Sequence, residues 1–375
     1  MEIKQYVAKT LQGLEGVLAS ELLALGASDV QPGRRMVEFR ADCKTMYKIN
    51  YCAYTALRIL ESFHTFTFTD VHDFYDHLRS LPWKNIINAD STIAIDATVF
   101  NCNAFNNSHF TEMKTKDAVA DYFRDTFGKR PSVSLNNPGL LINVFIQGDL
   151  CHVSLDTSGT PLYKRGYREL LHEASLNEVL AAGMIRLSGW KGEGDFYDPM
   201  CGGATIPIEA AMFASGMPAG YFREQWGFMN WKSYEPAIWN EVKNENSTQS
   251  SGNSFSIYAS DISNLSIRVA RKNLASARMM KVIQIEQCPF DKLMPKSEKG
   301  ILIFNPPYNV RLEVNDLISF YQSLGDHLKH NFAGHQAWII SSDANAIKYV
   351  GLKPFKKFAL MNGPLEAKFH GFSLY

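Results

Sequence analysis

The spacing of apolar residues divides the chain into three stretches of different character. Between residues 14 and 25 leucine recurs at helical spacing, and Gly26 follows where a helix would end, which predicts one amphipathic helix. Short strands flank this helix at 5–8 and 36–39, and a second helix is predicted around 47–60. The first sixty or so residues therefore form a small α+β unit.

A second stretch runs from about residue 65 to 155. Strand patterns at 91–100 and 140–147 bracket a helix predicted over 111–127. This helix and the residues just after it carry basic side chains, whose ordinary interpretation is a solvated helix face. They are Lys114, Lys116, Arg124, Lys129 and Arg130.

After residue 170, strands alternate with helices. Such alternation predicts a Rossmann-like α/β fold with a mostly parallel sheet, whose ligands bind beyond the carboxyl ends of the strands. A polar stretch without periodicity, 244–256, is interpreted as a surface loop inside this unit. The predicted strands are 195–198, 255–261, 282–286, 301–305 and 337–341, and the predicted helices are 176–187, 205–214, 265–278 and 317–329.

Length and composition fit a protein of two or three folded domains. The chain has 375 residues, of which 46% are hydrophobic and 20% charged. It contains no uncharged apolar run long enough to cross a bilayer, and its first residues lack the apolar core of a secretory signal. We therefore expect a cytoplasmic protein that does not interact with membranes.

Charge and cysteine content narrow the chemistry further. The 38 basic and 38 acidic side chains cancel, so any binding to a polyanion must rely on local patches. The six cysteines show no spacing typical of a metal site. We expect reduced thiols, no metal and a monomeric protein.

Two strand ends indicate a nucleoside-type ligand. After Asp198, the segment 200–205 contains Gly202 and Gly203, which let a backbone approach a ligand closely, although a purely structural turn explains these glycines equally well. Asp261 closes the next strand, where a carboxylate can accept hydrogen bonds from two ribose hydroxyls or favour the dipole of the following helix. Neither an ATPase phosphate loop nor the third glycine of a nicotinamide fingerprint is found.

The sharpest motif is Asn305-Pro306-Pro307-Tyr308, directly after an apolar strand. The prolines fix the backbone so that the Asn305 side-chain oxygen and the Pro306 carbonyl can both accept hydrogen bonds, and Tyr308 can stack on a flat group. Two acceptors that hold the hydrogens of an aromatic amine favour its nucleophilic, pyramidal form. The motif therefore predicts methyl transfer to an exocyclic amine, and a rigid turn at the strand end explains it less well.

These residues resemble the class I RNA methyltransferases that carry an N-terminal ferredoxin-like segment and a THUMP domain, especially the bacterial 23S ribosomal RNA guanine-N2 methyltransferases of the RlmL type. The resemblance covers nearly the whole chain. It rests on 162–168 (LYKRGYR), 198–211 (DPMCGGATIPIEAA) and 305–312 (NPPYNVRL), and 110–123 looks like the long helix of a THUMP domain.

The resemblance implies three domains and a cofactor. A ferredoxin-like segment (1–64) and a THUMP domain (65–158) would precede a Rossmann-like methyltransferase domain (159–375). S-adenosylmethionine would lie with its methionine part against Asp198 and its ribose on Asp261. The residues expected to contact it are Ala174, Asp198, Met200, Gly202, Gly203, Asp261, Ile262, Phe290 and Asn305.

Four positions depart from the pattern of the family. Gly203 and Ala204 stand where the family loop has Ser and a second Gly, which narrows the room for the cofactor. Pro289 replaces an Asp that is expected near the adenine, and Ser175 stands where Pro is common.

The expected substrate is a base of structured RNA, unpaired or flipped out so that it reaches the pocket. We expect guanine N2 of 23S rRNA. Alternatives are a tRNA guanine-N2 enzyme, an adenine-N6 methyltransferase acting on DNA or RNA, and a catalytically silent RNA-binding assembly factor. The basic residues of 111–130 would contact phosphates, together with Lys164, Arg165 and Arg168.

Overall fold

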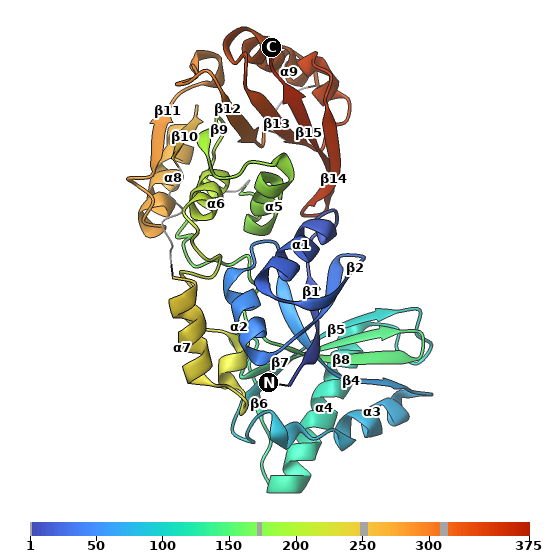
Figure 1. Ribbon diagram of the computed structural model, residues 1–375. Helices are drawn as coiled ribbons and strands as arrows, with labels where there is room; N and C mark the ends of the chain where they lie inside the picture. Colours follow the sequence, from blue (N-terminus) through green and yellow to red (C-terminus); the bar gives the residue numbers. More distant parts are fainter. Residues whose placement is uncertain (1, 171–174, 248–253, 308–313) are drawn as a thin grey trace.

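A computed structural model describes residues 2–170, 175–247, 254–307 and 314–375. Two sheets organise the molecule, one in each half of the view in Figure 1. The N-terminal sheet occupies the lower half, and the C-terminal sheet occupies the upper half.

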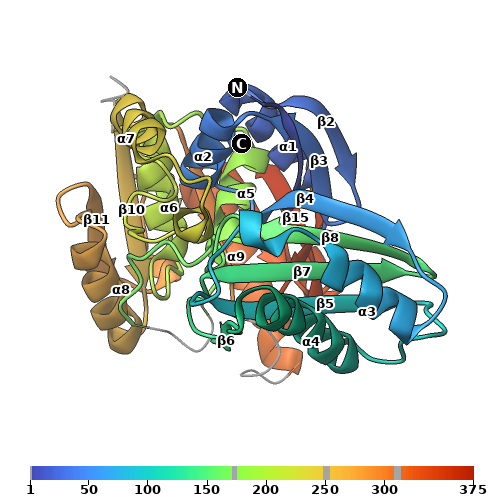
Figure 2. The ribbon, with the colours of Figure 1, turned by 90° about the horizontal axis from the view of Figure 1, so that it is seen from below.

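The N-terminal sheet has eight strands in the order β2-β3-β1-β4-β8-β7-β5-β6. Its ladders are antiparallel except those that β5 forms with β6 and β7. The sheet is continuous through both of the first two stretches of the sequence, because β4 crosses from one to the other (Figure 2). The strands are β1 (Lys4–Lys9), β2 (Ser28–Gly33), β3 (Met36–Ala41), β4 (Arg58–Thr67), β5 (Thr92–Phe100), β6 (Ser132–Val133), β7 (Leu140–Gln147) and β8 (Leu150–Asp156).

Two helix ends in the N-terminal half have the caps that the sequence favours at such positions. Gly26, with φ of 104°, ends α1 as the sequence predicts, and Asn107 caps the first turn of α4. The helix predicted over 47–60 is wrong beyond Cys52, because Arg58 already begins β4, whose burial and pairing between β1 and β8 outweigh local propensity. The helices are α1 (Glu15–Leu25), α2 (Cys43–Cys52), α3 (Val71–Ser80), η1 (Trp83–Asn85) and α4 (Ser108–Phe127).

The C-terminal sheet has seven strands in the order β11-β10-β9-β12-β13-β15-β14. The first five pair in parallel and β15 pairs antiparallel with β13 and β14, so the mostly parallel sheet predicted after residue 170 is confirmed. The strands are β9 (Gly194–Asp198), β10 (Phe255–Asp261), β11 (Ile283–Gln287), β12 (Gly300–Phe304), β13 (Gln336–Ser341), β14 (Lys356–Asn362) and β15 (Leu365–Ser373).

Helices cover both faces of this sheet. Buried residues of α5, α6 and α8 share one core with Ile301 and Ile303 of β12, whereas α9 and η4 share another core with Leu302 and Phe304. Side chains alternate along a strand, so the two cores lie on opposite faces of the sheet. The elements are α5 (Glu178–Ser188), α6 (Thr205–Ala214), α8 (Asn264–Ser276), η3 (Phe290–Lys292), α9 (Val314–Asn331) and η4 (Ala346–Val350).

The segment between α6 and β10 returns to the N-terminal half. It contains η2 (Gly227–Asn230) and α7 (Pro236–Glu245), and α7 lies beside α2 in Figure 1. The Phe228 ring lies 4.3 Å from that of Tyr47, between centroids, and Trp239 packs edge-on against Tyr51. These aromatic contacts bury the segment in the N-terminal core.

Candidate active site

Three predicted site residues lie at one edge of the C-terminal sheet. Asp198 ends β9, Asp261 ends β10 and Asn305 follows β12, and these three strands are neighbours that run in parallel. The carboxyl ends of parallel strands meet at the same edge. The strand that follows β9 in sequence, β10, lies on one side of β9, and the later strand β12 lies on its other side. The strand order therefore reverses at β9, which makes this edge the topological switch point of the sheet.

The loop after β9 is fastened to the end of β10. Gly202 donates its backbone N–H to the Asp261 carboxylate at 2.9 Å, and Cys201 donates its N–H to the Ser260 carbonyl, also at 2.9 Å. Asp261 accepts a further N–H from Ser263 at the start of α8. The Asp261 carboxylate therefore holds the loop in place and interacts favourably with the positive end of the α8 dipole. Its remaining lone pairs can accept hydrogen bonds from ligand hydroxyls.

Asp198 is an acid in a dry environment. Its exposed fraction is 1%, and burial raises the pKa of its carboxyl well above the usual range, with the charge of Asp261 adding to the shift. The Met200 N–H, 3.2 Å away, opposes this effect only in part. A cationic ligand group beside Asp198 would favour its ionised form.

The loops after β10 and β11 are joined beside this edge. Gln287 donates from its side chain to the Ile262 carbonyl at 3.0 Å, and the Ile262 side chain remains 69% exposed. Phe290 is half-buried, with its ring near those of Phe304 and His327. Pro289 has an extended backbone conformation and directly precedes η3. Phe290, whose ring is predicted to contact the adenine, is the first residue of η3.

The Asn-Pro-Pro-Tyr motif is described in part. Asn305 is half-buried, Pro306 is buried and Pro307 is exposed, directly after the fully buried end of β12. Tyr308, predicted to stack on the base, lies outside the described residues, and so does Ala174.

The linker arginines do not have the roles predicted for them. Arg165 is 2% exposed and pairs with Glu209 of α6 at 3.3 Å, so its prediction as a phosphate contact is wrong. The guanidinium of Arg168 is also engaged, with Glu178 and Thr205, and the prediction that it contacts phosphate is corrected likewise. Lys164 is exposed. Glu209 was missed by sequence reasoning, although a lone acid within the apolar helix TIPIEAAMFA is a signal that could have found it.

The basic side chains around α4 are interleaved with acids. Lys116 pairs with Asp117, and Arg124 pairs with acids in the same helix. Lys129 pairs with Asp90, in the loop before β5, at 3.2 Å, and Lys114 lies over the Phe110 ring. Most of these cations already have partners, which reduces the positive potential that this helix offers to RNA.

Metal-ligand clusters and membrane-spanning helices are both absent from the residues that the structure describes. No group of three or more His, Cys, Asp or Glu side chains among these residues is arranged to hold a metal ion. Nor does any helix that they form have the length and apolar character needed to cross a membrane.

Family comparisons match three segments of the chain in succession. Residues 5–60 match the RlmL ferredoxin-like domain, residues 68–156 match the THUMP domain, and residues 165–370 match the RMKL-like methyltransferase domain.

Individual relatives extend over nearly all of the chain. The Ribosomal RNA large subunit methyltransferase K/L of Psychromonas ingrahamii is 36% identical, over 96% of this chain and 49% of that relative. The chain therefore spans about half the length of that protein. A Synechocystis protein named "Putative RNA methyltransferase slr0064" is 31% identical over 99% of this chain and 97% of the relative.

A solved structure has the same architecture throughout. It is that of "SMU.472, a putative methyltransferase complexed with SAH", which is 26% identical, has a TM-score of 0.88, and aligns over 100% of this chain and 99% of its own. In this chain the RlmL ferredoxin-like and THUMP domains precede the methyltransferase domain. The RMKL-like methyltransferase domain matches more than half of the chain, which therefore belongs to the RMKL-like methyltransferase family.

Proposed function

We propose that this protein is an S-adenosylmethionine-dependent RNA methyltransferase whose most favoured target is guanine N2 of 23S rRNA. The observation that carries the proposal is the meeting of Asp198, Asp261 and Asn305 at the switch point of the parallel sheet. Ligands of open α/β sheets bind at this position. An rRNA substrate implies a cytoplasmic site of action.

The residues at this edge fit the cofactor chemically. The buried Asp198 carboxylate has a raised pKa, and a ligand that brings an ammonium and a sulfonium would offset its desolvation. Asp261 has lone pairs left for ribose hydroxyls after binding the N–H groups of Gly202 and Ser263. Ile262 and Phe290 offer apolar surface for the adenine. SMU.472, which shares the fold, is complexed with SAH, the demethylated form of the same cofactor.

The bound cofactor would supply an electrophilic methyl group, and the chain supplies the geometry of the nucleophile. Asn305 and the Pro306 carbonyl follow β12 where two acceptors can hold an exocyclic amine. This holding raises the share of the amine that is pyramidal and orients its lone pair. The proposed stacking of the base on Tyr308 completes the pocket.

The case for an RNA substrate comes from the domains that precede the site. The chain carries a THUMP domain, and its curated relatives are named as ribosomal RNA or RNA methyltransferases. The basic residues that remain proposed as phosphate contacts are Lys114, Lys116, Arg124, Lys129, Arg130 and Lys164. Arg165 and Arg168 are no longer among them.

Calorimetric titration with SAH tests the cofactor assignment. The wild type should bind one equivalent, and Asp198→Asn should weaken the affinity by about tenfold or more because a charge-assisted contact is lost. Asp195→Asn, at the opposite end of the same strand, is the matched control and should leave the affinity unchanged. A wild type that binds no SAH would favour the catalytically silent RNA-binding factor.

Mass spectrometry of nucleosides from a strain that lacks this gene tests the substrate. Loss of N2-methylguanosine from 23S rRNA is the expected result. Loss of the same nucleoside from tRNA, or of N6-methyladenosine, would instead favour one of the alternatives.

A further inference from the structure

Arg168 makes a convergent set of contacts in the interior of the methyltransferase domain. Its Nη2 donates to the Thr205 hydroxyl and to the Leu176 carbonyl, each at 3.0 Å. The same nitrogen lies 3.0 Å from a carboxylate oxygen of Glu178. The two charged side chains are only 16% and 5% exposed, so this ion pair is shielded from solvent.

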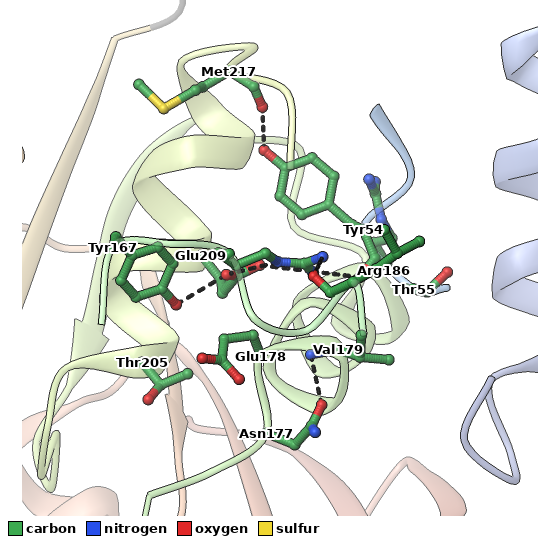
Figure 3. A network of polar contacts seen from close by, with 12 residues as sticks. Tyr54, Thr55, Tyr167, Asn177, Glu178, Val179, Arg186, Thr205, Glu209 and Met217 are labelled. Atoms are coloured by element: carbon green, nitrogen blue, oxygen red, sulfur yellow. Dashed lines mark hydrogen bonds and ion pairs between the residues drawn. The ribbon is translucent and has the colours of Figure 1, made fainter. Parts of the chain in front are cut away.

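The partners of Arg168 begin two helices. Thr205 is the first residue of α6, directly after the loop 199–204, and Glu178 is the first residue of α5. The positive end of a helix dipole disfavours a cation, so a guanidinium at two helix starts requires a compensating acid. Glu178 supplies that acid and also holds Arg168 toward Thr205. Figure 3 shows Glu178 and Thr205 at the starts of their two helices.

The loop that Arg168 borders is strained and therefore depends on its anchors. Ala204 has φ of 63°, in the left-handed region that costs a residue with a Cβ about 1 kcal/mol. On one side the loop is held by the bond from Gly202 to Asp261, and in the middle Asn273 donates to the Gly203 carbonyl at 3.0 Å. The contact from Arg168 to Thr205 is the anchor at its end.

A second buried contact joins the same linker to α6. Arg165 pairs with Glu209, one helical turn beyond Thr205. Tyr167 donates its hydroxyl to the same carboxylate at 3.0 Å (Figure 3). Arg165 also donates to the Tyr54 carbonyl in the N-terminal half. The linker 162–168 thus holds α6 at two points, and the contact at Thr205 is the one next to the loop.

We propose that Arg168 is a positioning residue, which acts through Thr205 and Glu178 to hold the loop 199–204 in the conformation that receives the cofactor. That the ligand is S-adenosylmethionine rests on the proposed function, whereas the effect of Arg168 on the conformation of the loop does not. The role differs from a phosphate contact because the guanidinium faces the two helix starts.

The test removes the contact at Thr205 and leaves the charges in place. Thr205→Val is nearly isosteric and loses the hydroxyl, and Thr205→Ser restores it. Arg186→Gln is the matched control, because Arg186 lies in α5 and pairs with Glu21 at a comparable exposure of 23% and 8%, away from the loop. Hydrogen exchange of the backbone amides of 200–205 is measured without ligand, and SAH affinity is measured by calorimetry.

Thr205→Val should raise amide exchange in 200–205 and weaken SAH binding, each by about tenfold, the scale of one lost hydrogen bond to a charged group. Thr205→Ser should behave as wild type, and Arg186→Gln should leave both measurements unchanged. Wild-type exchange in Thr205→Val, failure of Ser to rescue, or an equal effect in Arg186→Gln would overturn the proposal. If the wild type binds no SAH, the proposed function fails, and the exchange data still decide the positioning role.

Discussion

Glu209→Gln is the substitution for which the structure gives the clearest expectation. The Glu209 side chain is fully buried and that of Arg165 is 1% exposed, so the Gln variant leaves a guanidinium in the interior without its counter-charge. Two of its donors keep their partners, the carbonyls of Leu162 and Tyr54. The donors that face Glu209 would meet a neutral amide instead.

The expected cost is large relative to ordinary protein stability. Removing one partner of a buried ion pair costs about 3–5 kcal/mol, because an uncompensated charge stays in a medium of low polarity. A folded domain has about 5–15 kcal/mol in total, so the loss is a substantial fraction. Replacing both residues, as in Arg165→Met with Glu209→Gln, removes the uncompensated charge. The double variant should therefore lose less than the sum of the two single variants, by about 1–3 kcal/mol.

A double-mutant cycle measures this coupling. Urea unfolding of the wild type, Glu209→Gln, Arg165→Met and the double variant is followed by circular dichroism at low and high salt. The coupling energy should not change with salt, because the pair is buried. Additive losses, or a coupling that disappears at high salt, would refute the assignment of Glu209 as the counter-charge of Arg165.

Further predictions concern pH, the loop and RNA. Burial raises the pKa of Glu178 to about 7 from 4.5, so the folded state binds more protons than the unfolded state between these pH values. The free energy of unfolding should therefore fall by about 3 kcal/mol as pH rises through that window. Urea titrations at successive pH values measure this fall, which Glu178→Gln should remove. Ala204→Val should lower the thermal midpoint, since a β-branched residue at φ of 63° adds about 1–2 kcal/mol of strain, whereas Ala204→Gly should be tolerated; equal midpoints for both would contradict the strain. Lys114→Glu with Lys116→Glu should weaken RNA binding and reduce its salt slope by about 2 in fluorescence anisotropy, with SAH affinity retained; unchanged RNA affinity would exclude this face of α4.

The sheet edge could be predicted from sequence because its determinants are local. Each apolar run that becomes a parallel strand ends in a polar residue, and parallel strands bring those ends together, as at Asp198, Asp261 and Asn305. The C-terminal hairpin of β14 and β15 was not predicted, nor was the docking of α7 on α2. Such contacts depend on surfaces far apart in the chain.

The linker shows why charged residues are harder to interpret. A basic sequence such as KRGYR has the same appearance whether its side chains face solvent or a buried acid. Glu209 lies 44 residues after Arg165. Arg168 meets both Glu178 of α5 and Thr205 of α6, two helices that pack side by side. The composition of the linker predicts positive charge, and the fold decides that two of its cations are internal.

Transfer of a labelled methyl group from S-adenosylmethionine to unmodified 23S rRNA, compared between the wild type and Asn305→Ala, tests the central proposal most directly. Asn331→Ala, at the last residue of α9, serves as the control. The amine-holding role predicts that Asn305→Ala folds normally and loses at least about a hundredfold in rate, as expected when a positioned polar group is removed from a transition state, while the control keeps its activity. Wild-type rates in Asn305→Ala would contradict that role.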